Sequence, residues 1–145
     1  MGGVHSVNTP EIFEPADDEL LEDVDVDSMY PSIIVSQGLY PQHLGPEFTE
    51  VYAGIISERL EAKRNGNKLK NETLKLSVNG LSGNLQSEYS WCYDPKMALT
   101  IRINGQLMLL MLAEGLSEIG CKIIQSNTDG VFVLMKKNLQ EKAHA

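Results

Sequence analysis

The chain contains the stretch Asp23-Val24-Asp25-Val26-Asp27, in which acidic and apolar residues alternate. Alternation with a period of two is typical of a strand that has one face on a core and the other in water. Tyr30-Pro31 ends the pattern, because proline interrupts regular strand pairing. We therefore predict a half-buried strand with Asp25 close to its end, preceded by an acidic loop that extends from Pro10 to Glu22.

A second acidic residue is predicted to lie at the tip of a β-hairpin. Ile123-Ile124 and Val131-Phe132-Val133-Leu134 are short apolar runs, and Asn127-Thr128-Asp129-Gly130 separates them. Asn, Asp and Gly favour the backbone conformations of tight turns. Asp129 is therefore expected in the turn between two antiparallel strands.

Three helices are predicted between these strands. One extends from about Phe48 to Arg64, and after the break Asn65-Gly66-Asn67 a second extends from about Lys70 to Leu81, so the two should form an antiparallel hairpin. Asp94-Pro95 and Gly120 are typical start and stop signals that bracket a third, longer helix.

Apolar residues occur almost all around the long helix, so we expect it to be buried, with its stripe from Leu107 to Leu116 in the core. Trp91 and Tyr93 are expected to pack beside it.

Composition restricts the class of protein. The 145 residues suffice for one domain, and the net charge of −8 argues against a free-standing nucleic-acid-binding module, which is normally basic. Arg59 is the first Lys or Arg of the chain, and it begins the one basic segment. It consists of Arg59, Lys63, Arg64, Lys68, Lys70 and Lys75.

The two cysteines, Cys92 and Cys121, form no metal-binding or disulfide pattern and are interpreted as free thiols in a reducing compartment. No signal peptide or apolar run of membrane-spanning length is present, so we expect a cytoplasmic protein with no membrane partner.

The order of motifs resembles that of the family B DNA polymerases, in particular the phage enzymes. Residues 25–34 are similar to the first palm motif, D-x-x-S-L-Y-P-S-I, with Met29 in place of Leu, and residues 75–83 resemble the fingers motif K-x-x-x-N-S-x-Y-G. Asn127-Thr128-Asp129 resembles the D-T-D hairpin with its first Asp replaced. Gly2-Gly3 is similar to the end of the loop that precedes the palm.

The resemblance implies an α+β fold, in which an antiparallel palm sheet packs on helices and a helical hairpin is inserted as fingers. Residues 1–47 would be the first part of the palm, residues 48–83 the fingers, and residues 84–145 the second part of the palm. The editing exonuclease and the thumb of the family have no counterpart here, so we expect the chain to be part of a longer protein.

The implied chemistry is two-metal nucleotidyl transfer. Two ions roughly 4 Å apart help to deprotonate a primer 3'-hydroxyl and to neutralise the pyrophosphate. Mg²⁺, with Mn²⁺ as an alternative, prefers oxygen ligands, and one or two carboxylates plus phosphates suffice. By resemblance the ligands are Asp25, Asp129 and the carbonyl of Val26. In the plainer interpretation, Asp25 is a solvated acid and Asp129 an ordinary turn residue.

Arg59 and Lys63 are four residues apart and share one helical face, and the hairpin can bring Lys75 beside them. By resemblance these cations bind the phosphates of the incoming nucleotide, and Lys75 also assists catalysis. The alternative is a solvated helix face with Glu58, Glu61 and Glu72, and we assign Arg64, Lys68 and Lys70 to it.

Other nucleotide contacts are implied at Ser28, Tyr30, Asn79 and Gly83. Tyr30 resembles the steric gate that excludes a ribose 2'-hydroxyl, and its alternative is a core tyrosine. Ser82 stands where the family has a tyrosine, which removes a base-stacking surface.

We therefore expect a fragment of a template-directed DNA polymerase whose partners are primer-template DNA and deoxynucleoside triphosphates. The alternative is a catalytically inactive remnant that binds a nucleotide or a partner protein. A reverse transcriptase would be expected to have two adjacent Asp residues in the hairpin, and only Asp129 is present there.

Overall fold

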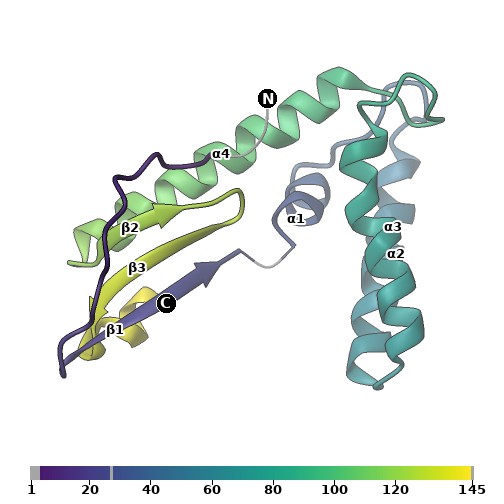
Figure 1. Cartoon of the computed structure of the whole chain (residues 1–145). Coiled ribbons are helices and arrows are strands. Elements are labelled where there is room, and N and C mark those ends of the chain that lie inside the picture. The colour runs from purple at the N-terminus through teal and green to yellow at the C-terminus, as the bar shows by residue number, and fades with distance from the viewer. Residues whose placement is uncertain (1–3, 27, 145) are drawn as a thin grey trace. The chain divides into compact units, whose positions relative to one another are not determined.

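The computed structural model describes residues 4–26 and 28–144, so Gly2-Gly3 and Asp27 lie outside the described residues. The fold is α+β, as expected, and the chain divides into two compact units. One unit comprises residues 1–27 and 104–145, and the other comprises residues 28–103. Figure 1 shows the order of the elements along the chain. The palm and fingers boundaries are functional assignments, and they stay predictions.

The first unit contains a three-stranded antiparallel sheet formed by β1 (Glu19–Asp25), β2 (Lys122–Ser126) and β3 (Gly130–Lys136). The strand order is β1-β3-β2, so the hairpin strand β3 is central. The predicted hairpin is confirmed. The first strand begins earlier than the alternation of residues 23–27 indicated, because Glu19 to Glu22 also pair with β3.

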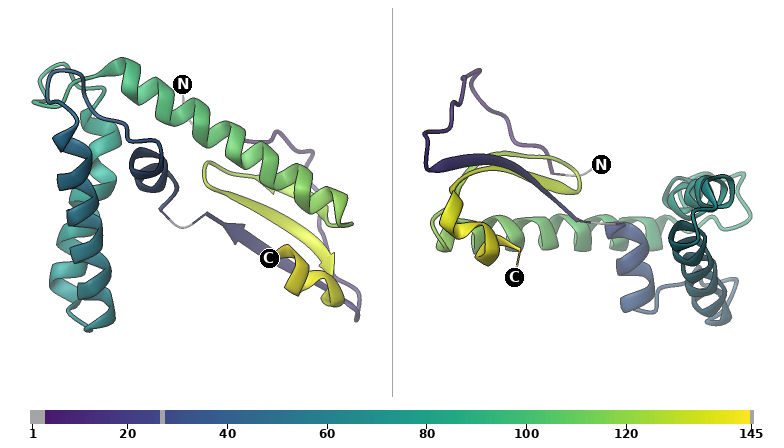
Figure 2. Two further views of the ribbon diagram at one scale, coloured as in Figure 1. Left: turned by 180° about the vertical axis from the view of Figure 1, so that it is seen from behind. Right: turned by 90° about the horizontal axis from the view of Figure 1, so that it is seen from below.

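One face of this sheet carries the core of the unit. Val131, Val133 and Met135 are buried and pack against Leu109 and Leu116 of α4 (Pro95–Glu118). Figure 2 shows the C-terminal part of α4 along this face. A 3-10 helix, η1 (Lys137–Leu139), and the short α5 (Gln140–Ala143) follow the last strand. The helices thus cover one face, as predicted.

The second unit is helical and contains α1 (Met29–Ser36), α2 (Glu47–Arg64), α3 (Lys68–Asn84) and the first part of α4. The predicted hairpin is confirmed, because α2 and α3 pack side by side (Figure 1). Gly66 has a φ of 69°, and its left-handed conformation ends α2 with a tight turn before Asn67 caps α3. The Asn67 side chain accepts a hydrogen bond from the Lys70 backbone N–H.

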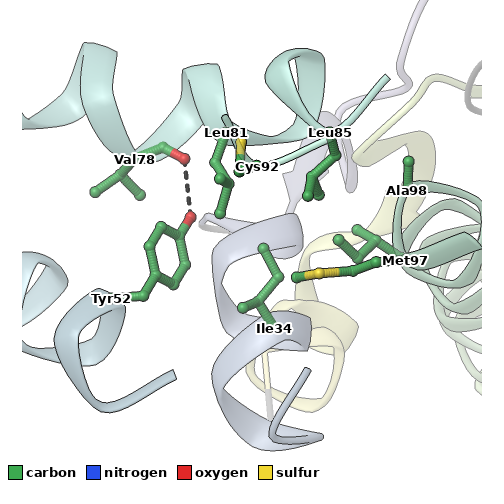
Figure 3. Close-up of a cluster of buried hydrophobic side chains, with 9 residues drawn as sticks. Ile34, Tyr52, Val78, Leu81, Leu85, Cys92, Met97 and Ala98 are labelled. Carbon is green, nitrogen blue, oxygen red and sulfur yellow. Dashed lines mark hydrogen bonds between the residues drawn. The ribbon is translucent and has the colours of Figure 1, made fainter. Parts of the chain in front are cut away.

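The core of the helical unit joins all four helices. Ile34, Tyr52, Val78, Leu81 and Met97 are among its buried residues, and Figure 3 shows them together. The Tyr52 hydroxyl donates a hydrogen bond of 2.8 Å to the carbonyl oxygen of Val78, linking α2 to α3. Burial raises the pKa of this hydroxyl above its ordinary value of 10.0, so it keeps its proton to a higher pH than an exposed tyrosine does.

Two packing predictions were wrong. The long helix α4 is only partly buried, since Leu107, Leu110 and Met111 are exposed to 54%, 51% and 69%. Trp91 and Tyr93 are also exposed, at 69% and 42%. A helix with apolar residues on all sides is covered only where a neighbour lies against it, and in this chain the two hydrophobic cores cover one stripe of α4.

Helix α1 was not predicted. Pro31 falls in its first turn, where a missing N–H costs no helical hydrogen bond, so proline does not prevent a helix here. Ser28 directly precedes the helix and has a φ of 52°, a left-handed conformation that is uncommon for a residue with a side chain.

Candidate active site on the sheet

The end of β1 lies beside the turn of the β2–β3 hairpin. Asp25 pairs with Gly130 as the last residue pair of the β1–β3 ladder. One residue further, the Val26 N–H donates a hydrogen bond of 2.8 Å to the carbonyl oxygen of Asp129. The two acids predicted to meet are therefore brought together at the backbone level, although they are 104 positions apart in the chain.

Gly130 provides space for the Asp25 carboxylate. A Cβ atom at this position would lie 2.7 Å from Asp25 Oδ1, closer than side chains pack. Gly130 does not have a positive φ, so the absence of a side chain matters here for space rather than for backbone conformation. The carboxylate of Asp25 thus lies directly over the backbone of the hairpin.

The hairpin turn is ordered by its own hydrogen bonds. The Asn127 N–H donates to the carbonyl oxygen of Gly130 at 2.8 Å, and Asn127 Oδ1 accepts from the Thr128 N–H at 2.8 Å. His5 Nε2 lies 3.2 Å from the Thr128 hydroxyl oxygen. The Asn127 amide therefore contributes to the turn itself, which is a structural role available to asparagine and to aspartate alike.

A β-bulge determines which side chains share the face of the sheet that lies away from α4. The register of β2 against β3 shifts between Ile123 and Gln125, so that Gln125 pairs with Phe132. Without the extra residue Gln125 would pair with the buried Val131, and its side chain would point into the core. The bulge instead places Gln125 beside Asp23, Asn127 and Phe132, and these four residues line a pocket of about 300 Å³.

The N-terminal segment follows the free edge of β2. The Ser6 N–H donates to the Ser126 carbonyl at 3.2 Å, and the Ser126 N–H donates to Ser6 Oγ at 3.0 Å. Asn8 Nδ2 donates to the Ile124 carbonyl. These bonds satisfy backbone groups that an exposed edge strand would leave unpaired. The sequence contained no clear signal for this contact.

The predicted nucleotide-binding residues lie in the helical unit. Arg59 of α2 is partly buried, and its Nη1 donates a hydrogen bond of 3.3 Å to the Ser28 hydroxyl. Arg59 Nε is buried and has no hydrogen-bond partner among the described residues. An unsatisfied buried donor costs about 1–3 kcal/mol, so this guanidinium can gain from an added acceptor.

The other predicted cations and base contacts are exposed. Lys63 is exposed on α2, and Lys75, Asn79 and Gly83 are exposed on α3, whose Val78 and Leu81 are buried. Lys70, which we assigned to an ordinary helix face, forms an ion pair of 2.5 Å with Glu58. Tyr30 is partly buried and packs against the core of the helical unit. Its role as a steric gate stays a prediction.

Side chains of metal-binding type do not gather into a cluster in the part of the chain that the structure describes. Within the described ranges 4–26 and 28–144, no three His, Cys, Asp or Glu side chains are close enough together to hold an ion. Both cysteines are buried free thiols, as expected. In the same ranges no helix has the length and hydropathy needed to cross a bilayer.

Two comparisons relate the chain to known polymerases, whereas no protein-family model matches it. Over 87 residues, or 60% of the chain, the sequence is 31% identical to DNA polymerase II of Escherichia coli (strain K12), and the match covers 11% of that protein. The solved family B DNA polymerase of the hyperthermophilic archaeon Pyrobaculum calidifontis matches 98% of the chain with a TM-score of 0.67 and 17% identity.

The resemblance to family B DNA polymerases, predicted from the motifs, is therefore confirmed in sequence and in fold. The closer likeness to phage enzymes stays a prediction. The chain spans 25% of the archaeal polymerase and 11% of the bacterial one, so it corresponds to a small part of each.

Proposed function

We propose that this chain is the palm and fingers part of a template-directed DNA polymerase that joins deoxynucleoside triphosphates to a primer 3'-hydroxyl. The observation that carries the proposal is the pairing of the Asp25 strand end with the Asp129 hairpin, at the site where the motifs resemble those of the family B polymerases. The similarity in sequence and fold to two such enzymes supports the same assignment.

The oxygen donors at this strand end suit Mg²⁺ or Mn²⁺. Asp25 and Asp129 offer exposed carboxylates, and the carbonyl of Val26 is a third hard oxygen donor. The space above Gly130 leaves the Asp25 carboxylate at the open edge of the sheet. Mg²⁺ normally keeps several waters and binds substrate phosphates, so a set of one or two carboxylates is sufficient. Bound ions would supply charge neutralisation for the phosphates and activation of the primer hydroxyl.

Arg59, Lys63 and Lys75 would hold the phosphates of the incoming nucleotide, and Lys75 would also stabilise the departing pyrophosphate. The partly buried Arg59 supports this role, because its Nε–H has no acceptor among the residues that the structure describes, and phosphate oxygens are strong acceptors. The hydrogen bond from Arg59 to Ser28 would hold the guanidinium in a fixed orientation.

The sugar and the base would be recognised by neighbouring residues of the same unit. Tyr30 would exclude a ribose 2'-hydroxyl, and its packing against the core would limit the movement of the ring. Ser28 would lie at the nucleotide beside Arg59. Asn79 and Gly83, exposed on α3, would line the nascent base pair. Ser82 would provide no stacking surface there.

A non-catalytic remnant is the second candidate. Asn127 removes one negative charge from the hairpin, and Ser82 removes an aromatic ring from the fingers motif. Both changes are compatible with a module that binds a nucleotide or a partner protein without turnover. The first motif, which departs from the family pattern only at Met29, and the position of Asp25 at the sheet edge favour the polymerase.

The whole protein is proposed to act in the cytoplasm, or in the host cytoplasm if it is encoded by a phage. Its partners would be primer-template DNA, deoxynucleoside triphosphates, and the exonuclease and thumb regions of a longer chain. Because the thumb grips duplex DNA in the family, we propose that the 145-residue chain alone extends a primer weakly or not at all.

The deciding experiment measures Mn²⁺ binding with and without a deoxynucleoside triphosphate, in the wild-type chain and in Asp25→Ala. The polymerase assignment predicts binding that the nucleotide strengthens and that Asp25→Ala weakens at least about tenfold, since one of the few charged ligands is lost. Equal and negligible binding in both proteins would favour the remnant.

A further inference from the structure

The helical unit contains a cavity of about 410 Å³ that is lined by residues of α2 and α3 and by Leu44 and Trp91. All of the lining residues lie within residues 28–103, so the cavity belongs to this unit alone. Eight of the ten are apolar or aromatic, and the other two are Glu47 and Ser77. Volume and composition are typical of a site for a small molecule.

Three aromatic side chains form part of the wall. Phe48 and Tyr52 lie one turn apart on α2, and their rings are stacked with centroids 5.9 Å apart. Trp91 is 69% exposed, and His43 Nε2 donates a hydrogen bond of 2.8 Å to its carbonyl oxygen, which holds the backbone of Trp91. Flat apolar groups pack well against such rings. A ligand that covers Trp91 would therefore remove a large apolar surface from water.

The hydroxyl groups of the cavity wall already donate hydrogen bonds to the backbone. The Tyr52 hydroxyl donates to the Val78 carbonyl at 2.8 Å, as Figure 3 shows, and the Ser77 hydroxyl donates to the Thr73 carbonyl at 3.3 Å. A water molecule needs about two to four polar partners to be held in a cavity. The interior therefore favours an apolar occupant over ordered water.

Glu47 adds a negative charge at the mouth of the cavity. The residue is exposed in the first turn of α2, and among the described residues it is the only charged one that lines the cavity. In the same part of the chain, no Lys, Arg or His forms an ion pair with it. A positively charged group at the mouth would be attracted by this carboxylate, and aromatic rings attract cations as well.

We propose that the cavity binds a small molecule that has a flat apolar ring system and one positively charged arm, with the rings inside and the charge at Glu47. A nucleotide is the opposite kind of ligand, because its phosphates would be repelled by the carboxylate. The proposal does not rest on the polymerase function, since Lys75 and Asn79, which we assign to nucleotide binding, do not line the cavity.

The test compares three probes of one shape and different charge: biphenyl-4-ylmethylamine, biphenyl-4-ylmethanol and biphenyl-4-carboxylate. Each is titrated into the whole chain. Trp91 is the only tryptophan of the sequence, so its fluorescence reports on the cavity. Isothermal titration calorimetry gives the affinities independently of that signal.

We expect the amine to shift the Trp91 emission to shorter wavelength, because the ligand covers the indole. It should bind about fivefold more tightly than the alcohol, as the Coulomb energy of two charges about 4 Å apart in water predicts, and the carboxylate should bind most weakly. Glu47→Gln should reduce the affinity for the amine to that for the alcohol. The matched control is Glu50→Gln, which removes an exposed charge from the same helix outside the cavity and should retain the preference.

A second pair of variants tests the space inside. Ser77→Leu adds a larger side chain to the cavity wall from an exposed position and should weaken the binding of the amine and the alcohol at least about tenfold. Thr73→Leu adds the same side chain to α3 outside the cavity lining and should leave both affinities unchanged. Circular dichroism verifies that each variant is folded.

The following results would overturn the proposal. The first is that neither the amine nor the alcohol binds to the wild-type chain. The second is that Ser77→Leu binds both as tightly as Thr73→Leu does, which would place the probes elsewhere. Equal affinities of wild type for the amine and the alcohol, or equal losses in Glu47→Gln and Glu50→Gln, would refute the preference for a cation. All of these results would leave the Mn²⁺ test of the polymerase function unaffected.

Discussion

The backbone N–H of Val26 donates a hydrogen bond of 2.8 Å to the carbonyl oxygen of Asp129, which ties the end of β1 to the turn of the β2–β3 hairpin. A hydrogen bond at this point keeps the residue after Asp25 in contact with the residue before Gly130. The relative positions of the two acids therefore depend on strand pairing and not on side-chain contacts alone.

Replacing Gly130 by Ala should displace the Asp25 carboxylate, since the new Cβ would lie 2.7 Å from Oδ1. The Asp25 carboxylate is the end of an exposed side chain and can move, whereas the backbone carbonyl of Val24, 3.3 Å from the new Cβ, must also shift slightly. We therefore expect the free energy of unfolding to fall by about 1 kcal/mol. Mn²⁺ affinity should also fall several-fold.

Gly54→Ala is the matched control, because nothing lies within 4 Å of the added methyl group in α2. This change should raise the free energy of unfolding by about 0.5–1 kcal/mol and leave Mn²⁺ affinity unchanged. An unchanged Mn²⁺ affinity in Gly130→Ala would contradict the importance of the space above Gly130.

Removing the Tyr52 hydroxyl should destabilise the helical unit. Tyr52→Phe deletes the bond to the Val78 carbonyl and should lower the free energy of unfolding by about 1 kcal/mol, measured by urea denaturation at neutral pH. Tyr89→Phe alters a tyrosine that is 93% exposed and should have no measurable effect.

The raised pKa of the Tyr52 hydroxyl predicts that the stability of the fold depends on pH in the alkaline range. Burial raises its pKa in the folded state above the ordinary value of 10.0, so the folded chain retains a proton that the unfolded chain loses. Stability should therefore be fully present below about pH 10 and decline as the pH rises above it. The decline between about pH 9 and about pH 11 should be smaller in Tyr52→Phe than in wild type. Equal declines would argue against burial of this group.

Helix α4 offers a test of its one-sided packing. Leu109 is 1% exposed and its neighbour Leu110 is 51% exposed. Leu109→Ala should lower the free energy of unfolding by about 2–5 kcal/mol, whereas Leu110→Ala should cost less than about 1 kcal/mol. Similar losses for the two variants, measured by urea denaturation, would indicate that the helix is covered on both sides.

The proposed phosphate contact can be tested at Lys75. Lys75→Ala should weaken the binding of a deoxynucleoside triphosphate about tenfold or more, since charge-assisted contacts to phosphate are strong. Lys68→Ala removes an equal charge from a position to which we assign no role. Isothermal titration calorimetry in the presence of Mn²⁺ measures the nucleotide affinity of both variants. Equal losses of affinity in Lys75→Ala and Lys68→Ala would point to an effect of general charge rather than to a specific contact.

Local signals predicted much of this fold. Asn65-Gly66-Asn67 and Asp94-Pro95 mark helix ends through backbone preferences that act over a few residues, and the structure has its helix boundaries close to them. The hairpin around Asp129 was predictable for the same reason. Interactions of this kind are local, and a single sequence displays them directly.

Features that depend on distant partners were not predictable. The extension of β1 to Glu19 requires pairing with Lys136, and the bulge near Gln125 is visible only in the register with β3. The exposure of Leu110 depends on which neighbours cover α4. The proximity of Asp23 to Asp25 was implicit in the alternation of the strand, whereas its proximity to Gly130 and Asn127 was not.

The most direct test of the central claim, that Asp25 and Asp129 share divalent ions, is a double-mutant cycle of Mn²⁺ affinity in the presence of a deoxynucleoside triphosphate. Asp25→Asn and Asp129→Asn should each weaken binding about tenfold or more, and the double variant should lose less than the product of the two effects, because both residues contact the same ions. Wild-type affinity in Asp129→Asn, or fully independent effects of the two changes, would contradict a shared site.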